Sequence, residues 1–317
     1  MTSSLTVVLS TLNGSERLPD VLDDLICAET PDTGFEVIVV DNASTDNTSD
    51  ILQSYSDKLP LTALYEPRAG KNIALNRALA VSTGDLIVFT DDDVRLPADF
   101  LRRYRDVADK ELSYQIFGGH IAPRWSQPPD PRILQEVPLN TAYALTESDR
   151  EQGDIRANRL YGPNMAIRRS VFESGLAFDE AIGPNGGTYI MGDETDLLLR
   201  AEAAGFKAYF VPQIVVEHKI RIEQLEIDWI ARRANLAGRS MVHNQIRKHH
   251  GRLPGVKKVF GMPRWAVNRL LVSEGQLMVH RILRFSSGSF SATWDSSFFR
   301  GYCSEYRKCM NEYGERW

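Results

Sequence analysis

The chain has 317 residues, of which 43% are hydrophobic and 25% are charged, and these proportions are typical of a globular protein with room for one large domain and an appendage. Its formal net charge of -5 argues against a general nucleic-acid-binding protein, so we expect no nucleic-acid partner. Three cysteines without metal-ligand spacing (Cys27, Cys303, Cys309) exclude a disulfide framework, and the lack of a signal segment or a long apolar run predicts a cytoplasmic protein that does not span the membrane.

Four short apolar runs in the first third of the chain are predicted to be strands. They cover Leu5–Leu9, Phe35–Val40, Leu61–Tyr65 and Leu86–Thr90. In the stretches between the first and second runs and between the second and third, the apolar residues have the spacing of helices. Near-continuous apolar runs suit strands that are buried on both faces. The pattern therefore predicts an α/β fold with a doubly wound, mostly parallel sheet.

Polar residues follow three of these predicted strands at the point where each strand ends. They are the segments 10–13, 41–44 and 91–93, with the sequences STLN, DNAS and DDD. In open parallel sheets, ligands bind beyond the carboxyl ends of the strands. We therefore expect the three segments to face one cleft.

Asp91, Asp92 and Asp93 are consecutive acids at the end of a buried strand. Neighbouring like charges raise each other's free energy, and burial adds to that cost, so a bound cation is the natural compensation. Carboxylate oxygens suit Mg²⁺ or Mn²⁺. The alternative is that Asp93 caps the helix expected around 97–104 while its neighbours are solvated.

The rest of the chain is expected to contain a loop, a helix and a strand, followed by long helices. Prolines between Ala122 and Pro138 predict a surface loop that could shape a binding site. A helix over Tyr189–Gly205 and a strand over Phe206–Pro212 are expected next. Beyond about residue 220, Trp229–His243 and Trp265–Phe285 have the pattern of long basic amphipathic helices.

Five motifs together resemble one known family. In chain order they read STLNGSERL, VIVVDNASTD, EPRAGKNIALNRAL, GDLIVFTDDD and GDETDLLLRAEAAG, and they are similar to those of family 2 glycosyltransferases of the GT-A fold. The resemblance covers most of residues 5–220. It implies a metal-dependent transfer of a sugar, with inversion, from a nucleotide-diphosphate donor such as a UDP-sugar to an acceptor hydroxyl. A saccharide or lipid-linked acceptor in polysaccharide synthesis is the expected context.

The resemblance also implies roles for residues around the nucleotide. Thr11 and Asp41 would bind the nucleoside, with Asn13 and Asn42 beside them. A carboxylate can accept the imide N–H of uracil, although an acid after a strand can equally form an Asx turn.

Phosphates and sugar would be held by the next motifs. Arg68 and Lys71 precede a helix expected to begin near Asn72, where they would hold phosphate oxygens or remain solvated loop charges. Asp91 and Asp93 match the outer acids of the family's DxD element and would ligate the metal. The two remaining residues of this group are Asp92, which would reach the ribose or share the metal, and Asn164, which would bond a sugar hydroxyl.

An inverting transfer needs a general base. Members of the family carry it in a Glu-Asp pair that opens a helix, and here the order is reversed as Asp193-Glu194, so both residues stay candidates, with Glu194 in the usual position. Alternatively these acids only complement the helix dipole, and Asp196 pairs with Arg200. The resemblance also suggests His218 as a further metal ligand, against the alternative that it is an ordinary histidine.

The C-terminal part is expected to form a separate helical extension over residues 221–317, after a catalytic domain over 1–220. Between Arg247 and Arg284 there is one acid, Glu274, and nine basic residues: Arg247, Lys248, Arg252, Lys257, Lys258, Arg264, Arg269, Arg281 and Arg284. This composition is typical of helices that lie on an anionic membrane surface. Dimerisation with a second copy and a solvated face packed on the catalytic domain are the alternatives.

Three other functions are less well supported by the sequence than sugar transfer. A sugar-phosphate nucleotidyltransferase should carry a Gly-rich, Arg-containing loop after the first strand, which STLNGSERL lacks. An inactive scaffold on the same fold is disfavoured because the acids of 91–93 and Glu194 are intact. An oxidoreductase is disfavoured because no GxGxxG follows the first strand.

Overall fold

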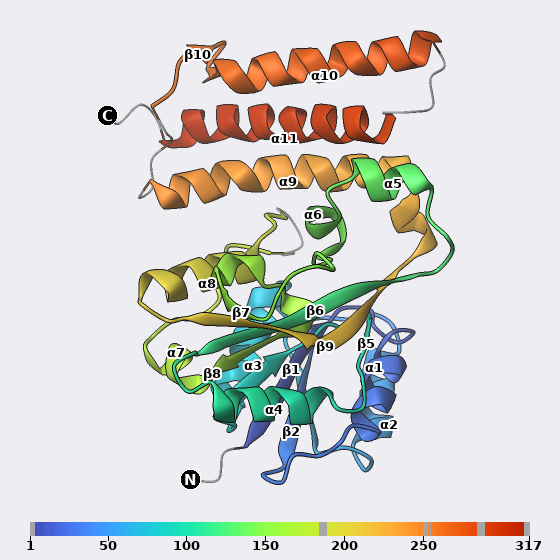
Figure 1. Cartoon of the computed structure of the whole chain (residues 1–317), viewed down its shortest axis with the longest axis vertical. Coiled ribbons are helices and arrows are strands. Elements are labelled where there is room, and N and C mark those ends of the chain that lie inside the picture. Colours follow the sequence, from blue (N-terminus) through green and yellow to red (C-terminus); the bar gives the residue numbers. More distant parts are fainter. Residues whose placement is uncertain (1–3, 184–188, 250–252, 254, 284–288, 314–317) are drawn as a thin grey trace. The chain divides into compact units, whose positions relative to one another are not determined.

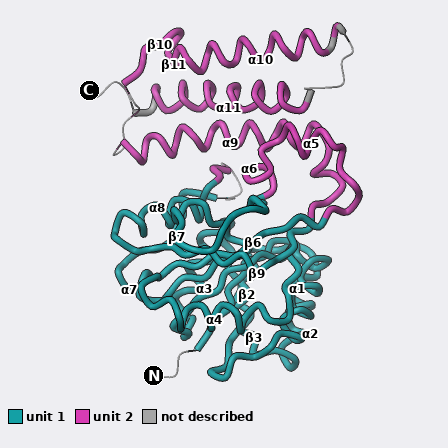
Figure 2. Tube along the Cα trace, viewed as in Figure 1, with its two compact units in different colours: residues 1–124, 144–188, 192–219 teal, residues 125–143, 189–191, 220–317 magenta. Residues whose placement is uncertain are grey.

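The computed structural model describes residues 4–183, 189–249, 253, 255–283 and 289–313 (Figure 1). The chain divides into two compact units (Figure 2). The first comprises residues 1–124, 144–188 and 192–219, and the second comprises 125–143, 189–191 and 220–317. Thus two segments that precede the boundary expected at residue 220 belong to the second unit.

The first unit is built on one sheet. Its elements are β1 (Leu5–Thr11), α1 (Leu18–Ile26), β2 (Phe35–Asp41), α2 (Thr48–Tyr55), β3 (Leu61–Tyr65), α3 (Lys71–Val81), β4 (Leu86–Phe89), β5 (Val94–Arg95), α4 (Phe100–Lys110), β6 (Ile116–Trp125), β7 (Gly153–Ile155), 3-10 helices at Ala157–Arg159 and Gly162–Asn164, β8 (Met165–Arg168), α7 (Arg169–Glu173), α8 (Asp193–Ala203) and β9 (Ala208–Ile220). The strands follow the order β3-β2-β1-β4-β8-β6-β9-β5, with β7 paired to β9.

The predicted α/β class is confirmed. Strands β3, β2, β1 and β4 are parallel, and β4 then pairs antiparallel with β8. Successive residues Val7 and Val8 point to opposite faces of β1, and both are fully buried. Val8 belongs to a core cluster that includes Ala74 and Leu75 of α3. The sheet is therefore covered on both faces, as the uninterrupted apolar runs predict.

Three local predictions need correction. The segment expected to be a loop over Ala122–Pro138 contains the end of β6 and helix α5 (Pro131–Glu136), which Asp130 caps by accepting from the Arg132 backbone N–H. The strand expected at Phe206–Pro212 runs on to Ile220, because its later residues pair with β5. His218 therefore lies within β9 and not after it.

The second unit is mainly helical. Its elements are α5, α6 (Leu139–Tyr143), a 3-10 helix at Ile222–Leu225, α9 (Ile227–Lys248), the hairpin strands β10 (Lys258–Val259) and β11 (Met262–Pro263), α10 (Arg264–Leu283) and α11 (Ser289–Tyr313). Within this unit α11 lies between α9 and α10 (Figure 1). No helix in the described ranges combines the length and the apolar character needed to cross a membrane.

Helices α9 and α11 approach each other closely at two glycines. A Cβ on Gly238 would lie 1.9 Å from the Phe298 carbonyl oxygen, and one on Gly301 would lie 2.1 Å from the Asn235 carbonyl oxygen. Such contacts require glycine, because any side chain would force the helices apart.

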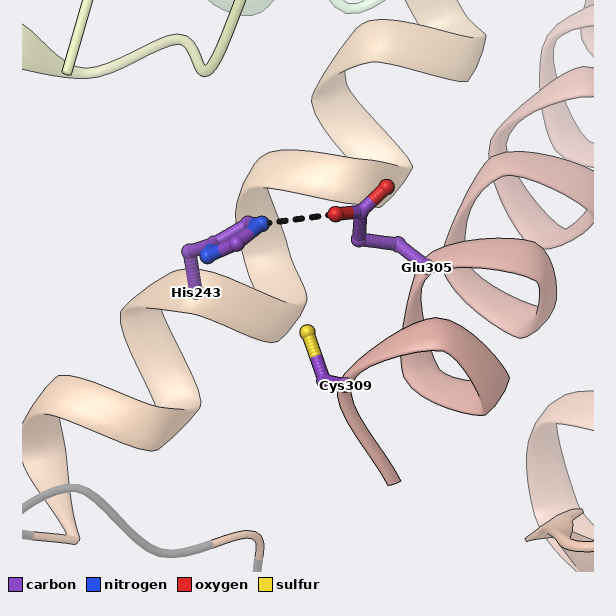
Figure 3. Close-up of side chains that lie close together, drawn as sticks. All are labelled: His243, Glu305 and Cys309. Atoms are coloured by element: carbon purple, nitrogen blue, oxygen red, sulfur yellow. Dashed lines mark hydrogen bonds and ion pairs between the residues drawn. The ribbon is translucent and has the colours of Figure 1, made fainter. Parts of the chain in front are cut away.

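Polar groups also connect these two helices. Glu305 accepts from Arg239 Nε at 2.8 Å through one oxygen, and its other oxygen lies 2.9 Å from His243 Nε2 (Figure 3). Cys309 lies one turn further along α11, with its sulfur within 4.8 Å of the interacting His243 and Glu305 atoms. Burial alone would raise the pKa of Glu305, but His243 and Arg239 lower it below its usual value of 4.5.

Glu305→Gln is therefore expected to lower the free energy of unfolding by about 2 kcal/mol, because it removes the charged acceptor that the partly exposed Arg239 and His243 share. Since the folded pKa of Glu305 is depressed, its contribution is fully present above pH 4.5 and is lost as the pH falls through the folded pKa. Urea denaturation at pH 7 and at pH 4 should show the difference between wild type and variant shrinking at the lower pH. The exposed Glu151→Gln is the matched control, and equal stability of all three proteins would contradict the role given to Glu305.

Candidate active site

The sheet register brings the predicted segments together. Thr11 at the end of β1 pairs with Asp41 of β2, and Val8 pairs with Phe89 of β4, so Asp92 comes level with Thr11 three residues later. The Thr11 hydroxyl donates to Asp92 Oδ2 at 2.5 Å. These strand ends line an open cleft of about 290 Å³, whose lining residues are Ser10, Thr11, Leu12, Arg17, Asn42, Lys71, Asp91, Asp92 and Asp93.

Each of the three aspartates faces a different basic group. Arg17 binds Asp92 through two nitrogens, at 2.9 and 3.1 Å. The Lys71 ammonium lies 2.7 Å from Asp91 Oδ1. Asp93 Oδ2 lies 3.4 Å from His218 Nε2, because β5 and β9 pair and set Val94 opposite His218. Arg17 was not predicted, since it lies before α1 and reaches Asp92 only through the fold.

Burial and neighbouring charges shift the pKa values of the ionisable side chains in the cleft. Burial raises the pKa of Asp91, with Lys71 opposing and Asp93 adding to the rise. Burial would also raise the pKa of Asp93, but the hydrogen bond and charge of His218 lower it. For Lys71, burial would lower the pKa, yet the charges of Asp91 and of the acids that open α8 raise it well above its usual value.

Residues at this edge of the cleft carry atom types that commonly bind divalent cations. Asp93 and His218 offer a carboxylate oxygen and an imidazole nitrogen from adjacent strands, with side chains 21% and 12% exposed. Asp91 adds a second carboxylate to the cleft lining, and the charge of Asp93 contributes to the raised pKa of Asp91. A set of hard oxygens with one imidazole suits Mn²⁺ and is compatible with Mg²⁺.

The second acidic pair lies on the other side of Lys71. Helix α8 begins at Asp193 after Gly192, whose φ of 95° turns the chain, and Glu194 Oε1 accepts from the Gly162 N–H at 3.1 Å. Both acids share with Lys71 and Asp91 a small cavity of about 10 Å³, the size of one water molecule. Lys71 therefore connects the acids of β4 with those of α8.

Asp193 and Glu194 titrate as a coupled pair. Burial and the neighbouring Glu194 charge raise the pKa of Asp193 well above its usual value. Burial acts on Glu194 in the same direction, but the hydrogen bond from Asp193, the charge of Lys71 and backbone N–H groups lower its pKa. The two pKa values are therefore pushed apart, with protonation favoured at Asp193 and the ionised form favoured at Glu194. Further along α8, Arg200 binds Asp196 at 2.9 Å, which confirms that predicted pair.

The polar residues after β2 organise the loops around the cleft. Asp41 Oδ1 accepts from the Ser44 N–H, three residues further along the chain, at 3.0 Å and so stabilises the turn that follows β2. Asn42 donates to the carbonyls of Glu66 and Arg68 and accepts from the Gly70 N–H, so its amide holds the loop that leads to α3.

Two of the predicted site residues, Asn13 and Arg68, do not line the cleft and instead interact with neighbouring residues. Asn13, exposed and with a φ of 51°, accepts from the Thr45 N–H at 2.8 Å. Arg68 is 61% exposed and pairs with Glu66 at 3.1 Å and with Glu180 at 3.4 Å.

Asn164 is 1% exposed, and the structure places it beneath the cleft surface. Its Oδ1 accepts from the Tyr104 hydroxyl at 2.7 Å, and its Nδ2 donates to the carbonyls of His120 and Ile214 at 2.8 and 2.9 Å. These bonds tie together three segments of the sheet and α4. The side-chain amide is thus engaged by protein groups, where a sugar hydroxyl was expected.

Asn164→Ala is accordingly expected to lower the free energy of unfolding by about 3 kcal/mol, because it leaves a hydroxyl and two carbonyls without their buried partner. Urea denaturation measures the change, with the exposed Asn140→Ala as matched control. A variant as stable as the wild type that bound nucleotide-sugar more weakly would contradict this structural role and favour the sugar contact.

Comparison with known proteins adds to this geometry. The profile of the family described as Glycosyl transferase family 2 matches residues 6–176. The succinoglycan biosynthesis protein ExoM of Rhizobium meliloti is 26% identical over 245 residues, which is 74% of this chain and 73% of that protein. A glucosyl-dolichyl phosphate glucuronosyltransferase of Haloferax volcanii is 23% identical over 174 residues, 54% of each chain.

Two solved structures share the fold. TarS of S. aureus, in complex with UDP-GlcNAc, aligns with a TM-score of 0.57 and 15% identity, over 98% of this chain and 91% of that one. The mannosyltransferase PcManGT of Pyrobaculum calidifontis, in complex with GDP-Man and Mn²⁺, aligns with a TM-score of 0.56 and 20% identity, over 98% and 88%. These likenesses confirm the predicted GT-A fold with a helical C-terminal region.

Proposed function

The chain belongs to glycosyl transferase family 2, and we propose that its first unit transfers a sugar from a UDP-sugar to an acceptor hydroxyl with inversion of configuration. The observation that carries the proposal is the position of Lys71. Its ammonium lies 2.7 Å from Asp91 Oδ1, and Lys71 also lines the small cavity that contains Asp193 and Glu194. A sugar bound at Lys71 would therefore have the proposed diphosphate site, near Asp91 and Asp93, on one side. On its other side it would have Glu194, a carboxylate that can accept a proton.

The donor nucleotide would lie along the ends of β1 and β2. Thr11 and Asp92 are joined there and would contact the ribose, while Asn42 holds the loop beside them. Asp41 uses one oxygen in its turn, and its other oxygen would accept the imide N–H of uracil. Arg17 and Lys71 would bind the phosphate oxygens, and Arg68 and Asn13 would stabilise the surrounding loops.

Asp93 and His218, together with Asp91, would hold Mn²⁺ or Mg²⁺. A bound divalent cation supplies positive charge that stabilises the departing nucleoside diphosphate. The ammonium of Lys71, which already lies against Asp91, would add to that stabilisation from the protein side.

Glu194 would act as the general base. The acceptor oxygen attacks the anomeric carbon as the bond from that carbon to the diphosphate breaks, and the hydroxyl proton passes to Glu194. The Gly162 N–H and a hydrogen bond from Asp193 would hold Glu194 in its ionised form. Asp193 would thus position the base and keep it ionised.

The acceptor is proposed to be a growing saccharide or a lipid-linked one in polysaccharide synthesis, at the cytoplasmic face of the membrane. The similarity to a succinoglycan biosynthesis protein and to a glucosyl-dolichyl phosphate glucuronosyltransferase supports this proposal.

Titration calorimetry of UDP and GDP tests the donor site. We expect UDP to bind in the presence of Mn²⁺, and its affinity to fall at least about tenfold in EDTA or in Asp41→Ala, which removes a base contact. Failure of both nucleotides to bind, with and without Mn²⁺, would contradict the proposal.

A further inference from the structure

Helix α10 has one packed face and one open face. Ala266 and Ser273 are buried, and Val267 and Leu270 pack on the core cluster that α9 and α11 form around Tyr302. In the second unit α10 is the end helix of the layer in which α11 is central (Figure 1). Among the described residues of this unit, no other helix packs against the opposite face of α10.

The open face is mainly apolar, and Asn268 is an exposed polar residue on it. Leu271, Val272, Met278, Val279 and Ile282 are between 50% and 66% exposed. Their spacing of 1, 7, 8 and 11 residues from Leu271 places them on one side of an α-helix. Apolar side chains are commonly exposed one at a time, whereas a continuous stripe marks a surface that binds something.

Acidic charge is absent from that stripe. Glu274, the single acid in the α10 sequence, is directed toward α11, where it accepts from Ser296 and from two nitrogens of Arg300. Exposed basic residues precede the stripe at Lys257 and Arg264. The open face therefore combines an apolar stripe with basic residues at its N-terminal end. This pattern is typical of helices that lie in the surface of an anionic membrane.

The turn that leads into α10 exposes a further apolar side chain. Strands β10 and β11 are joined by Phe260 and Gly261, with φ angles of 53° and 74°. Positive φ is unfavourable for a bulky residue, yet Phe260 occupies this turn and is 83% exposed. An aromatic side chain at a hairpin tip, beside Lys257 and Lys258, suits insertion among lipid headgroups.

A second copy of the chain would be the other way to cover the stripe. A helix of 20 residues is about 30 Å long and about 10 Å wide, which offers about 300 Å² in projection. A stable protein interface buries about 800 Å² of accessible surface on each partner, so residues beyond this one helix face would have to take part. A single helix face is sufficient for reversible binding to lipid, and the basic residues beside the stripe favour an anionic lipid surface.

We propose that the exposed face of α10 binds the surface of an anionic membrane, with Leu271, Val272, Met278, Val279 and Ile282 inserted among the lipids. The inference rests on the second unit alone. It can fail while the proposed sugar transfer holds, and the reverse is equally true. Of the basic residues expected at a membrane, Arg252 and Arg284 lie outside the described residues, so the face is defined by its apolar side chains.

Sedimentation with lipid vesicles tests the proposal. The full chain is expected to bind vesicles of phosphatidylcholine with phosphatidylglycerol, to bind pure phosphatidylcholine more weakly, and to dissociate from the anionic vesicles as salt rises. The double variant Met278→Gln/Ile282→Gln is expected to lower the vesicle partition coefficient about tenfold or more, because two apolar side chains no longer enter the lipid.

Leu112→Gln is the matched control, because Leu112 is 74% exposed in the first unit and its loss should leave vesicle binding unchanged. Since both substituted residues of α10 are exposed, all variants should unfold at the wild-type temperature. Three results would overturn the proposal: no binding to anionic vesicles, equal binding by the double variant, or a lipid-free dimer that the double variant converts to monomers.

Discussion

Glu194→Gln is expected to lower kcat about 10³-fold while the KM for the donor stays within about threefold, because the change removes a proton acceptor and little else. Glutamine keeps the size of the side chain and can still accept from the Gly162 N–H through its amide oxygen. The loss should therefore be in the chemical step. Steady-state kinetics with a turned-over donor and acceptor measure both constants.

Asp193→Asn is the control that separates the two acids. Asparagine can still donate a hydrogen bond to Glu194, as the protonated Asp193 does, so we expect a loss of about tenfold or less. A larger loss from Asp193→Asn than from Glu194→Gln would assign the base to Asp193. Unchanged kcat in both variants would remove the pair from the mechanism.

The second large effect is expected at Asp93. Asp93→Ala should abolish Mn²⁺ binding at this site and lower donor turnover by about 10³-fold, because it removes a carboxylate ligand and the partner of His218. His218→Ala should weaken Mn²⁺ binding by about 10- to 100-fold, since the two proposed carboxylate ligands, Asp91 and Asp93, would remain. Titration of Mn²⁺ followed by electron paramagnetic resonance measures both affinities.

A matched control for Asp93→Ala is the exposed Asp57→Ala on the first unit, which should leave Mn²⁺ affinity unchanged. Mn²⁺ bound equally by wild type and Asp93→Ala would contradict the ligand set. Loss of turnover with Mn²⁺ affinity intact would assign Asp93 to substrate contact instead.

The parallel half of the sheet and the cleft could be predicted from sequence for one physical reason. Buried parallel strands need apolar residues on both faces, so each strand is visible as an uninterrupted run, and the acids that interrupt the run mark its end. The pairing of Thr11 with Asp92, by contrast, depends on the register between β1 and β4. Arg17 was missed for the same reason, since its contact with Asp92 exists only in three dimensions.

Asn164 and α11 illustrate two other limits of the sequence. A buried amide bound to three protein groups and an amide bound to a sugar have the same sequence neighbours, and the structure alone shows that Asn164 is buried. Helix α11 lies within the predicted helical extension, but its own bounds were not predicted, because its serines, glycine and aromatic residues are weak helix formers. Packing between α9 and α10, through close contacts such as that of Gly301, compensates for this low propensity.

The most direct test of the proposed function is nucleotide release from a panel of UDP- and GDP-sugars, measured with Mn²⁺, with EDTA, and with Asp93→Ala in Mn²⁺. Slow hydrolysis without an acceptor is sufficient for detection. We predict that UDP is released from one donor in Mn²⁺, that EDTA stops the release, that excess Mn²⁺ restores it, and that Asp93→Ala lacks it. Release that EDTA leaves unchanged, or no release from any donor, would contradict a metal-dependent glycosyltransferase.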